Sequence, residues 1–233
     1  MTLMQRIRGW VPEIVSLLLF VVLTVALANG HLLALDLRVA DWVDTHRPAP
    51  FYWTLRVFNY LGQGGQVLTP VAIILTAFAT WRLRSVRPVL LFGSAYALFY
   101  LTIGPLKIWF DRAAPHFEGA NREILFNPDP LATGSLSMSY PSGHVANALA
   151  WYGVIAVLIN ALLAQPMPDK AYLALRILPP AIVFVTTTYL AFHWITDSVA
   201  GLLLGLILTR ILARVAVLLG FRPRTRTAAP VSP

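Results

Sequence analysis

Long apolar stretches, separated by short polar segments, make up most of the sequence. A helix needs about 20 apolar residues to cross the hydrocarbon core of a bilayer, and six stretches approach that length. They cover residues 13–35, 64–82, 88–110, 142–164, 173–195 and 197–219. The pattern therefore predicts an all-α integral membrane bundle of six transmembrane helices.

Residues 36–60 do not follow this pattern. Charged side chains such as Asp36, Arg38 and Asp41 are mixed with apolar ones such as Trp42. Helices that lie on a membrane surface have this mixed character, with one polar and one apolar face. We expect short helices at the membrane interface here and not a seventh span.

The first apolar stretch has two interpretations. Arg6 and Arg8 precede it, and Ala26-Leu27-Ala28 stands near its end, which is also the pattern of a cleavable signal peptide. We expect the stretch to be retained as an anchor, with cleavage as the alternative. Either outcome leaves the topology of the other spans unchanged.

The chain is expected to form one domain. Its 233 residues suit a single helical bundle, and no internal repeat divides them. We expect a six-helix domain over residues 1–221, followed by a disordered cytoplasmic tail over residues 222–233.

Composition supports a membrane protein. The chain is 58% hydrophobic and 12% charged, whereas soluble domains are about 45–50% apolar and about 25% charged. The absence of cysteine excludes disulfides and thiol chemistry. Enrichment in Ala, Pro and Arg is typical of a GC-rich bacterial genome and favours a bacterial inner membrane.

The basic residues predict the orientation. A net charge of +8 would suit a nucleic-acid partner, but twelve of the 18 basic residues lie on one side of the six-span arrangement. Because cytoplasmic loops are enriched in Lys and Arg, that side and both termini should be cytoplasmic, and we expect no nucleic acid. All five histidines lie on the other side, so a site built from them would face the periplasm or exterior.

Three groups of polar residues stand at the outer ends of different spans. Ionisable groups at membrane depth are costly and usually mark function. The groups are Lys107 to Pro115 after the third span, Pro141 to His144 before the fourth, and His193 to Asp197 between the fifth and sixth. The six-span arrangement allows all three to meet in one pocket.

Each group fits the chemistry of a phosphate ester. Ser142 and Gly143 begin a helix, where free backbone N–H groups and the positive dipole end attract phosphate. His144 can donate a proton to a leaving group. His193 and Asp197 are four residues apart, so on a helix they would share a face, and the carboxylate would leave the second imidazole nitrogen free to attack phosphorus.

Two cations complete the expected site. Lys107 and Arg112 bring positive charge to the phosphate oxygens, and an arginine can bind them bidentately. Taken singly, Lys107 would be a snorkelling span terminus and Arg112 an interface charge. The histidine and aspartate would be a structural pair or half of a metal site. We expect no metal and no cofactor, because no third carboxylate cluster or soft ligand accompanies them.

The residues resemble the type 2 phosphatidic acid phosphatase superfamily, with its motifs K-x6-R-P, P-S-G-H and S-R-x5-H-x3-D. Residues 141–144 match the second motif fully, as His193 and Asp197 match the end of the third. The resemblance implies that His193 is the nucleophile, that Asp197 orients it and that His144 is the general acid. It also implies phosphate binding by Lys107, Ser142 and Gly143.

Two of the three family motifs are incomplete. Ala114 stands where the first motif has arginine, and Thr186 and Thr187 replace the Ser-Arg pair of the third. A hydrogen bond to a charged group contributes about 1.5–3 kcal/mol, so both losses would weaken phosphate binding. Arg112, two residues before Ala114, is the expected substitute, and Arg122 is a second candidate.

The sequence therefore predicts a membrane phosphatase. Its substrate would be a phosphorylated lipid at the outer leaflet: a polyprenyl diphosphate, phosphatidic acid or phosphatidylglycerol phosphate, hydrolysed through a phosphohistidine. The alternative is a non-catalytic lipid-phosphate binder or scaffold with a degenerate pocket, which the two lost arginines favour. A transporter of phosphorylated lipids is a third hypothesis, but nothing resembles inverted repeats with broken helices.

Overall fold

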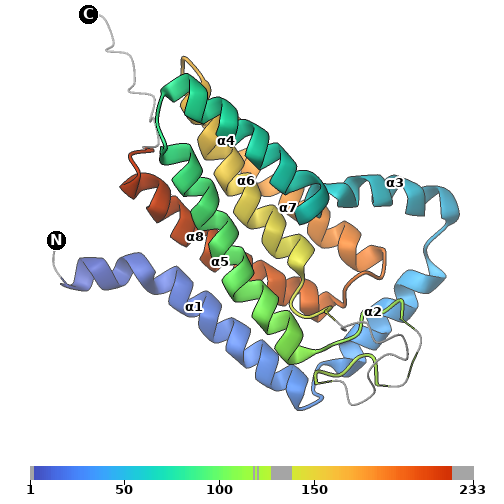
Figure 1. The fold of residues 1–233 in the computed structure, drawn as a ribbon. Helices are drawn as coiled ribbons and strands as arrows, with labels where there is room; N and C mark the ends of the chain where they lie inside the picture. Colours follow the sequence, from blue (N-terminus) through green and yellow to red (C-terminus); the bar gives the residue numbers. More distant parts are fainter. Residues whose placement is uncertain (1–2, 118, 120, 127–137, 222–233) are drawn as a thin grey trace, which may run out of the picture.

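The chain forms a bundle of long helices with two shorter helices at one end (Figure 1). The structure, a computed structural model, describes residues 3–117, 119, 121–126 and 138–221, with side chains from residue 9. The expected tail, residues 222–233, lies outside the described residues. The helices are α1 (Leu3–Ala28), α2 (Leu33–Thr45), α3 (Ala49–Asn59), α4 (Thr69–Leu83), α5 (Arg87–Phe110), α6 (Gly143–Leu162), α7 (Asp169–Tyr189) and α8 (Ile195–Leu218).

Six helical segments of the described chain are long and apolar enough to cross a membrane. A π-helical turn, Gly64–Leu68, extends α4 into one of them, Gly64–Leu83. The predicted all-α bundle of six spans is confirmed. The orientation of the termini across the membrane stays a prediction.

Two predicted spans were too long at their C-terminal ends. The first was expected to reach residue 35 but ends at Ala28, because a turn with Gly30 at φ +79° follows. The fifth was expected to reach residue 195 but ends at Tyr189, and Ala191 has φ +58° in the turn that follows. The turn at Ala191 lies between Leu190 and Phe192, so apolar composition did not indicate it. Around Gly30, the polar residues Asn29 and His31 were a signal that the predicted span passed over.

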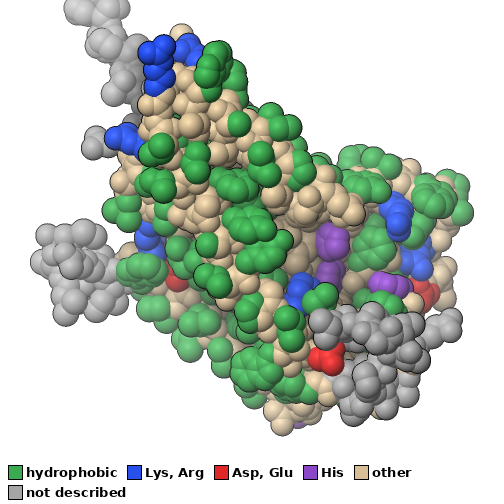
Figure 2. Space-filling model, viewed as in Figure 1, with side chains coloured by type: hydrophobic (Ala, Val, Ile, Leu, Met, Phe, Trp, Pro, Cys, Tyr) green, Lys and Arg blue, Asp and Glu red, His purple; other side chains and the backbone are tan. Residues whose placement is uncertain are grey.

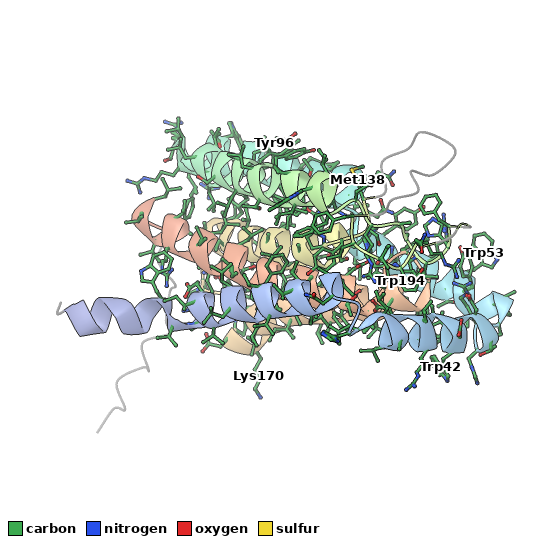
Figure 3. The ribbon with its side chains drawn as sticks, turned by 90° about the horizontal axis from the view of Figure 1, so that it is seen from below. Trp42, Trp53, Tyr96, Met138, Lys170 and Trp194 are labelled. Carbon is green, nitrogen blue, oxygen red and sulfur yellow. The ribbon has the colours of Figure 1, made fainter. Side chains whose placement is uncertain are left out.

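Helices α2 and α3 confirm that residues 36–60 form short helices and not a seventh span. Trp42 and Trp53 lie at the surface of these helices, 55% and 64% exposed (Figure 3). Tryptophan side chains at such positions are typical of the membrane–water interface.

Helix α6 is the centre of the bundle and packs against α4, α5, α7 and α8. Its contact with α8 is close because α8 presents glycines. A Cβ on Gly201 would lie 2.5 Å from the carbonyl oxygen of Ser142, and one on Gly205 would lie 2.7 Å from Leu149 Cδ1. The GxxxG pair of the last span thus brings α8 against the start of α6, where the candidate site residues stand.

Helix α1 packs against α8, and an ion cluster joins the two. The carboxylate of Glu13 is 3.0 Å from Arg210 Nε and 2.7 Å from an Arg214 amino nitrogen. Both arginines thus bind the carboxylate of Glu13, a residue only 5% exposed, because a buried charge requires a partner.

Candidate active site

A cavity of about 460 Å³, here called the histidine pocket, opens at the end of the bundle nearest α3. Figure 2 shows histidine side chains in a hollow at this end. The cavity is lined by Gly62, Gln63, Gly64, Lys107, Ala114, His116, Phe117, Met138, Ser139, Gly143, His144, Asn147, Phe192 and His193. Three chain segments that are distant in sequence therefore meet, as predicted.

The start of α6 forms one wall of the pocket. Ser142 is the N-cap residue, and its Oγ accepts a hydrogen bond of 3.4 Å from the backbone N–H of Val145. A Cβ on Gly143 would lie 3.1 Å from Lys107 Cε, so glycine gives the lysine chain room to pass. Lys107 Nζ donates a hydrogen bond to the carbonyl oxygen of Met138. Lys107 and the positive end of α6 thus face the same cavity.

The two motif histidines are in direct contact. His144 Nδ1 is 3.2 Å from His193 Nε2, and the rings are edge to face with centroids 5.4 Å apart. His144 stands in the first turn of α6, and His193 lies in the turn that precedes α8. The sequence had placed His193 and Asp197 on one helical face. The two residues are close, but they do not share a helical face. The chain turns into α8 between them, and this turn brings them together.

A serine links this histidine to the aspartate. Ser139 Oγ donates a hydrogen bond of 2.5 Å to Asp197 Oδ2 and lies 3.2 Å from His193 Nδ1. The direct distance from His193 Nδ1 to Asp197 Oδ2 is 3.6 Å, which is long for a hydrogen bond. The serine hydroxyl therefore relays the interaction between imidazole and carboxylate.

This network determines the tautomers. An ionised carboxylate only accepts, so Ser139 uses its proton on Asp197 and its oxygen accepts from His193 Nδ1–H. The Nε2 atom of His193 then carries a lone pair, and His144 must donate to it from Nδ1. The lone pair of one histidine and the proton of the other thus meet at the pocket.

Burial also favours the neutral imidazole of His193. Desolvation lowers the pKa of His193 below its ordinary value of 6.5. The charge of Lys107 lowers the pKa further, while the hydrogen bond toward Asp197 opposes the change. A neutral ring is the nucleophilic form.

Arg112 lies behind the histidines and does not line the pocket. Its guanidinium is fully buried, donating 2.5 Å to Asp197 Oδ1, 2.6 Å to Asp36 Oδ2 and 2.8 Å to Thr196 Oγ1. It also lies 5.2 Å from the ring centre of Trp194, an interior side chain (Figure 3). The expectation that Arg112 binds substrate phosphate is therefore not supported by this geometry, because its donors are already used by carboxylates and neighbouring acceptors.

Asp36 is the second carboxylate held by Arg112. It comes from α2 and also accepts 3.1 Å from the backbone N–H and 2.6 Å from the hydroxyl of Thr196. Thr196 belongs to the first turn of α8, beside Asp197. The start of α8, and with it Asp197, is thereby fixed from two sides.

Four of the seven predicted site residues line the pocket, and Asp197 stands directly behind one of them. The four are Lys107, Gly143, His144 and His193. Ser142 lies at the pocket edge, fully buried, with its hydroxyl used to cap α6. The roles of all seven in binding and catalysis stay predictions.

Several residues of the site were not predicted from sequence. Ser139 and Asp36 lie outside the motifs, and Asp36 belonged to a segment expected only to lie at the interface. Asn147 and His116, which also lie outside the motifs, line the pocket. The signal that could have identified Asp36 is its position: it is a charged residue on the apolar face of an amphipathic helix.

The two departures from the family motifs lie in different surroundings. Ala114 lines the histidine pocket, so an arginine at this position would enter the cavity. Thr187 is fully buried, and its hydroxyl has no hydrogen-bond partner within the described residues. Thr186 instead donates 3.1 Å to Asn59 Oδ1. Neither threonine replaces a cation in the pocket.

Among the described residues, no group of three His, Asp or Glu side chains is arranged to hold a metal ion. The site is instead a pair of imidazoles with a lysine on one side and a buried aspartate on the other. A six-span helical bundle with this pocket places the chain among integral membrane proteins that have a pair of histidines in a cavity at one end of the bundle.

The chain belongs to the PAP2 superfamily, whose family model matches residues 88–220. The family expected from the motifs is thus confirmed. Phosphatidylglycerophosphatase B of Bacillus subtilis is 34% identical over 104 residues. That match covers 44% of this chain and 45% of the relative, so the chain matches less than half of that protein's length.

The fold also resembles a solved structure. The crystal structure of a transmembrane PAP2-type phosphatidylglycerolphosphate phosphatase from Bacillus subtilis superposes with a TM-score of 0.69 at 21% identity. The similarity covers 93% of this chain and 98% of that chain. The shared architecture extends beyond the part matched by the family model.

Proposed function

We propose that this protein is a membrane lipid phosphatase that hydrolyses a phosphomonoester or diphosphate of a lipid. One observation carries the proposal. The Nε2 lone pair of His193 faces the pocket beside the Nδ1 proton of His144, next to Lys107 and the start of α6. A nucleophile, a proton donor and a phosphate seat are thus within reach of one bound group.

In the first step, His193 Nε2 attacks phosphorus, and the bond from phosphorus to the lipid oxygen breaks. His144 enters this step as an imidazolium with a proton on each ring nitrogen. It gives its Nδ1 proton to the departing oxygen and becomes neutral, so the lipid leaves as an alcohol or, from a diphosphate, as a monophosphate. The product on the protein is a phosphohistidine. The imidazolium that forms on His193 is stabilised through Ser139 by the carboxylate of Asp197.

In the second step, water attacks the phosphohistidine and the bond from nitrogen to phosphorus breaks. His144, now a neutral imidazole with a free Nδ1, accepts one proton from that water and becomes an imidazolium again. Inorganic phosphate is released, and both histidines return to their starting protonation states. The step consumes one water molecule and requires no oxidant or reductant.

The remaining site residues divide into phosphate binders and positioning residues. Lys107 supplies charge to the phosphate oxygens, and Gly143 lets the phosphate approach the backbone N–H groups at the start of α6. Ser139 and Arg112 act through Asp197, and Asp36 acts through Arg112. The motif serine, Ser142, holds the α6 terminus in the orientation that this binding requires.

The substrate is a lipid because the pocket stands at the end of membrane-spanning helices. The name of the Bacillus subtilis relative, a phosphatidylglycerophosphatase, favours phosphatidylglycerol phosphate among the three candidate lipids. The distribution of basic residues favours a pocket at the outer leaflet of the cell membrane. The active site thus faces the periplasm or exterior.

A second candidate function is supported by the motif departures. With Ala114 and Thr187 at the two arginine positions and Arg112 turned toward carboxylates, Lys107 is the charged side chain among the described residues that line the pocket. Such a site would bind lipid phosphate without efficient turnover, as in a scaffold protein. The intact histidine pair and the ordered Asp197 favour the enzyme.

The test is phosphate release by the purified full-length protein from phosphatidylglycerol phosphate, phosphatidic acid and a polyprenyl diphosphate. His193→Ala is the inactive control, and acid-labile, base-stable phosphate trapped on the wild type would identify the phosphohistidine. A parallel assay in EDTA should retain full activity. Lipid binding without release from any substrate would establish the scaffold instead, and loss of activity in EDTA would contradict the metal-free mechanism.

A further inference from the structure

A second cavity, here called the basic cavity, lies at the opposite end of the bundle from the histidine pocket. It has a volume of about 350 Å³ and is formed where α4, α6 and α8 end and α5 and α7 begin. Its lining residues are Leu83, Ser85, Arg87, Pro88, Val157, Asn160, Ala161, Tyr172, Leu219, Gly220 and Phe221. None of the catalytic residues proposed above contributes to it.

The cavity contains a cation without a carboxylate partner. Arg87 lies in its wall, and within the part of the chain that the structure describes, its guanidinium forms no ion pair. Gly220 has φ +85°, and a Cβ at this position would lie 3.0 Å from an Arg87 amino nitrogen. The glycine therefore allows the guanidinium to lie against the backbone turn after α8.

A second arginine stands directly beside the basic cavity. A small adjoining cavity of about 30 Å³ shares Val157 and Tyr172 with it and is also lined by Arg176 and Thr209. The guanidinium of Arg176 stacks 5.4 Å from the ring centre of Tyr172. The hydroxyl of Thr209 is buried without a hydrogen-bond partner within the described residues.

The surroundings favour an anion. No acidic residue is among the described residues that line either cavity. The first turn of α5, beginning at Arg87, adds the positive end of a 24-residue helix. Figure 2 shows further basic side chains gathered where α4 ends and α5 begins. Polar donors also come from Ser85 and Asn160.

The volume limits what this site can hold. At about 350 Å³, it is at the lower end of the range for small-molecule sites, so it has room for a phosphate with a small polar group. The flanking side chains Leu83 and Val86 are 40% and 67% exposed. They offer an apolar surface along which the chains of a lipid can extend.

We propose that the basic cavity binds the phosphate group of an anionic ligand through Arg87 and Arg176. Two sources share this chemistry, an anionic phospholipid headgroup and free inorganic phosphate. Because the cavity is separate from the histidines, this binding does not depend on the protein being a phosphatase.

The test measures binding to the purified full-length chain in detergent, in a Lys107→Gln background that removes the lysine of the histidine pocket. The probes are short-chain phosphatidylglycerol, short-chain phosphatidylcholine as the uncharged control, and inorganic phosphate. We expect saturable binding of phosphatidylglycerol, phosphate or both, and at least tenfold weaker binding in Arg87→Gln/Arg176→Gln. Whichever probe binds identifies the source.

Arg82→Gln is the matched control. Arg82 is an exposed residue at the same end of the bundle, but it does not line the cavity. The substitution removes one positive charge near the cavity, so this variant should bind the probe within twofold of its parent. Equal weakening by Arg82→Gln would show only general charge attraction and overturn the site. Absence of saturable binding, or unchanged binding in the double variant with an unaltered melting curve, would also overturn it.

Discussion

Arg112 donates a hydrogen bond of 2.5 Å to Oδ1 of Asp197, and both side chains are completely buried. The same guanidinium binds Asp36, so one arginine forms ion pairs with two carboxylates. Asp197 also accepts a hydrogen bond from the hydroxyl of Ser139, and this hydroxyl oxygen lies 3.2 Å from Nδ1 of His193. His193, the proposed nucleophile, is thus connected to α2 through a chain of buried polar groups.

We expect Arg112→Ala to lower both stability and activity. Removing one partner of a buried ion pair costs about 3–5 kcal/mol, and here two carboxylates lose their partner. Because Asp197 would lose its orientation, kcat should fall about 10²-fold or more with little change in KM. Thermal unfolding and steady-state kinetics measure the two effects.

Arg112→Lys separates the positioning role from a structural one. A point charge cannot reach both carboxylates as the planar guanidinium does, so the variant should fold but recover only part of kcat. A variant with unchanged kcat and a strongly raised KM would show that Arg112 binds substrate phosphate after all.

His144→Ala should affect substrates according to their leaving groups. A lipid alkoxide needs a proton as it departs, whereas an acidic phenol such as p-nitrophenol does not. We expect loss of at least 10²-fold in kcat/KM with the lipid but under tenfold with p-nitrophenyl phosphate. Equal losses on both substrates would remove His144 from the role of general acid.

The acid limb of the pH profile should lie below pH 6.5. His193 must be neutral to attack, and burial lowers the pKa of His193 below 6.5. The neutral form therefore persists as the pH falls through 6.5 and is lost only when the pH falls below the lowered pKa. The position of the acid limb is measured from the dependence of kcat/KM on pH. Because the charge of Lys107 contributes to the lowering, Lys107→Gln should move the limb to higher pH, and a limb above 6.5 in the wild type would contradict this account.

Ala114→Arg should increase activity. Ala114 lines the histidine pocket, and a charged hydrogen bond to phosphate contributes about 1.5–3 kcal/mol, or roughly 10- to 10²-fold in kcat/KM. Ala114→Gln, of similar length but neutral, is the control and should give little gain. A folded Ala114→Arg variant without improvement would show that the pocket does not seat phosphate beside this position.

Single cysteines can test the orientation, because the chain has none of its own. Asp41 on α2 and Lys170 on α7 are both exposed, at opposite ends of the bundle. In intact cells, an impermeant thiol reagent should label Asp41→Cys and spare Lys170→Cys until the cells are lysed. The reverse labelling would place the histidine pocket in the cytoplasm.

The spans and the meeting of the motif residues followed from the sequence for simple physical reasons. Hydrocarbon thickness sets the length of a span, and six spans of alternating direction bring Lys107, His144 and His193 to one end. Their approach within a single pocket of about 460 Å³ required no knowledge of side-chain packing.

The direction of Arg112 could not be predicted in this way. Its position two residues before Ala114 suggested a substitute for the lost arginine, but sequence distance does not determine where a side chain points beyond the end of a helix. Asp111 has φ +38° at the C-cap of α5, and the chain then directs Arg112 away from the pocket. Likewise, Ser139 and Asp36 join the network only through tertiary packing, which no spacing rule encodes.

Asp36 lies outside the part of the chain that the family model matches, although it belongs to the same buried ion cluster as Asp197. The family model covers residues 88–220, yet the carboxylate that shares Arg112 with Asp197 comes from α2, more than fifty positions before that boundary. A chimaeric protein could join residues 88–220 of this chain to the first helices of a relative. It would lack this negative charge unless the relative had an Asp or Glu at the position of Asp36. Arg112 and Asp36 therefore form one electrostatic unit across this boundary, and the loss of either charge leaves the other with an incomplete set of buried partners.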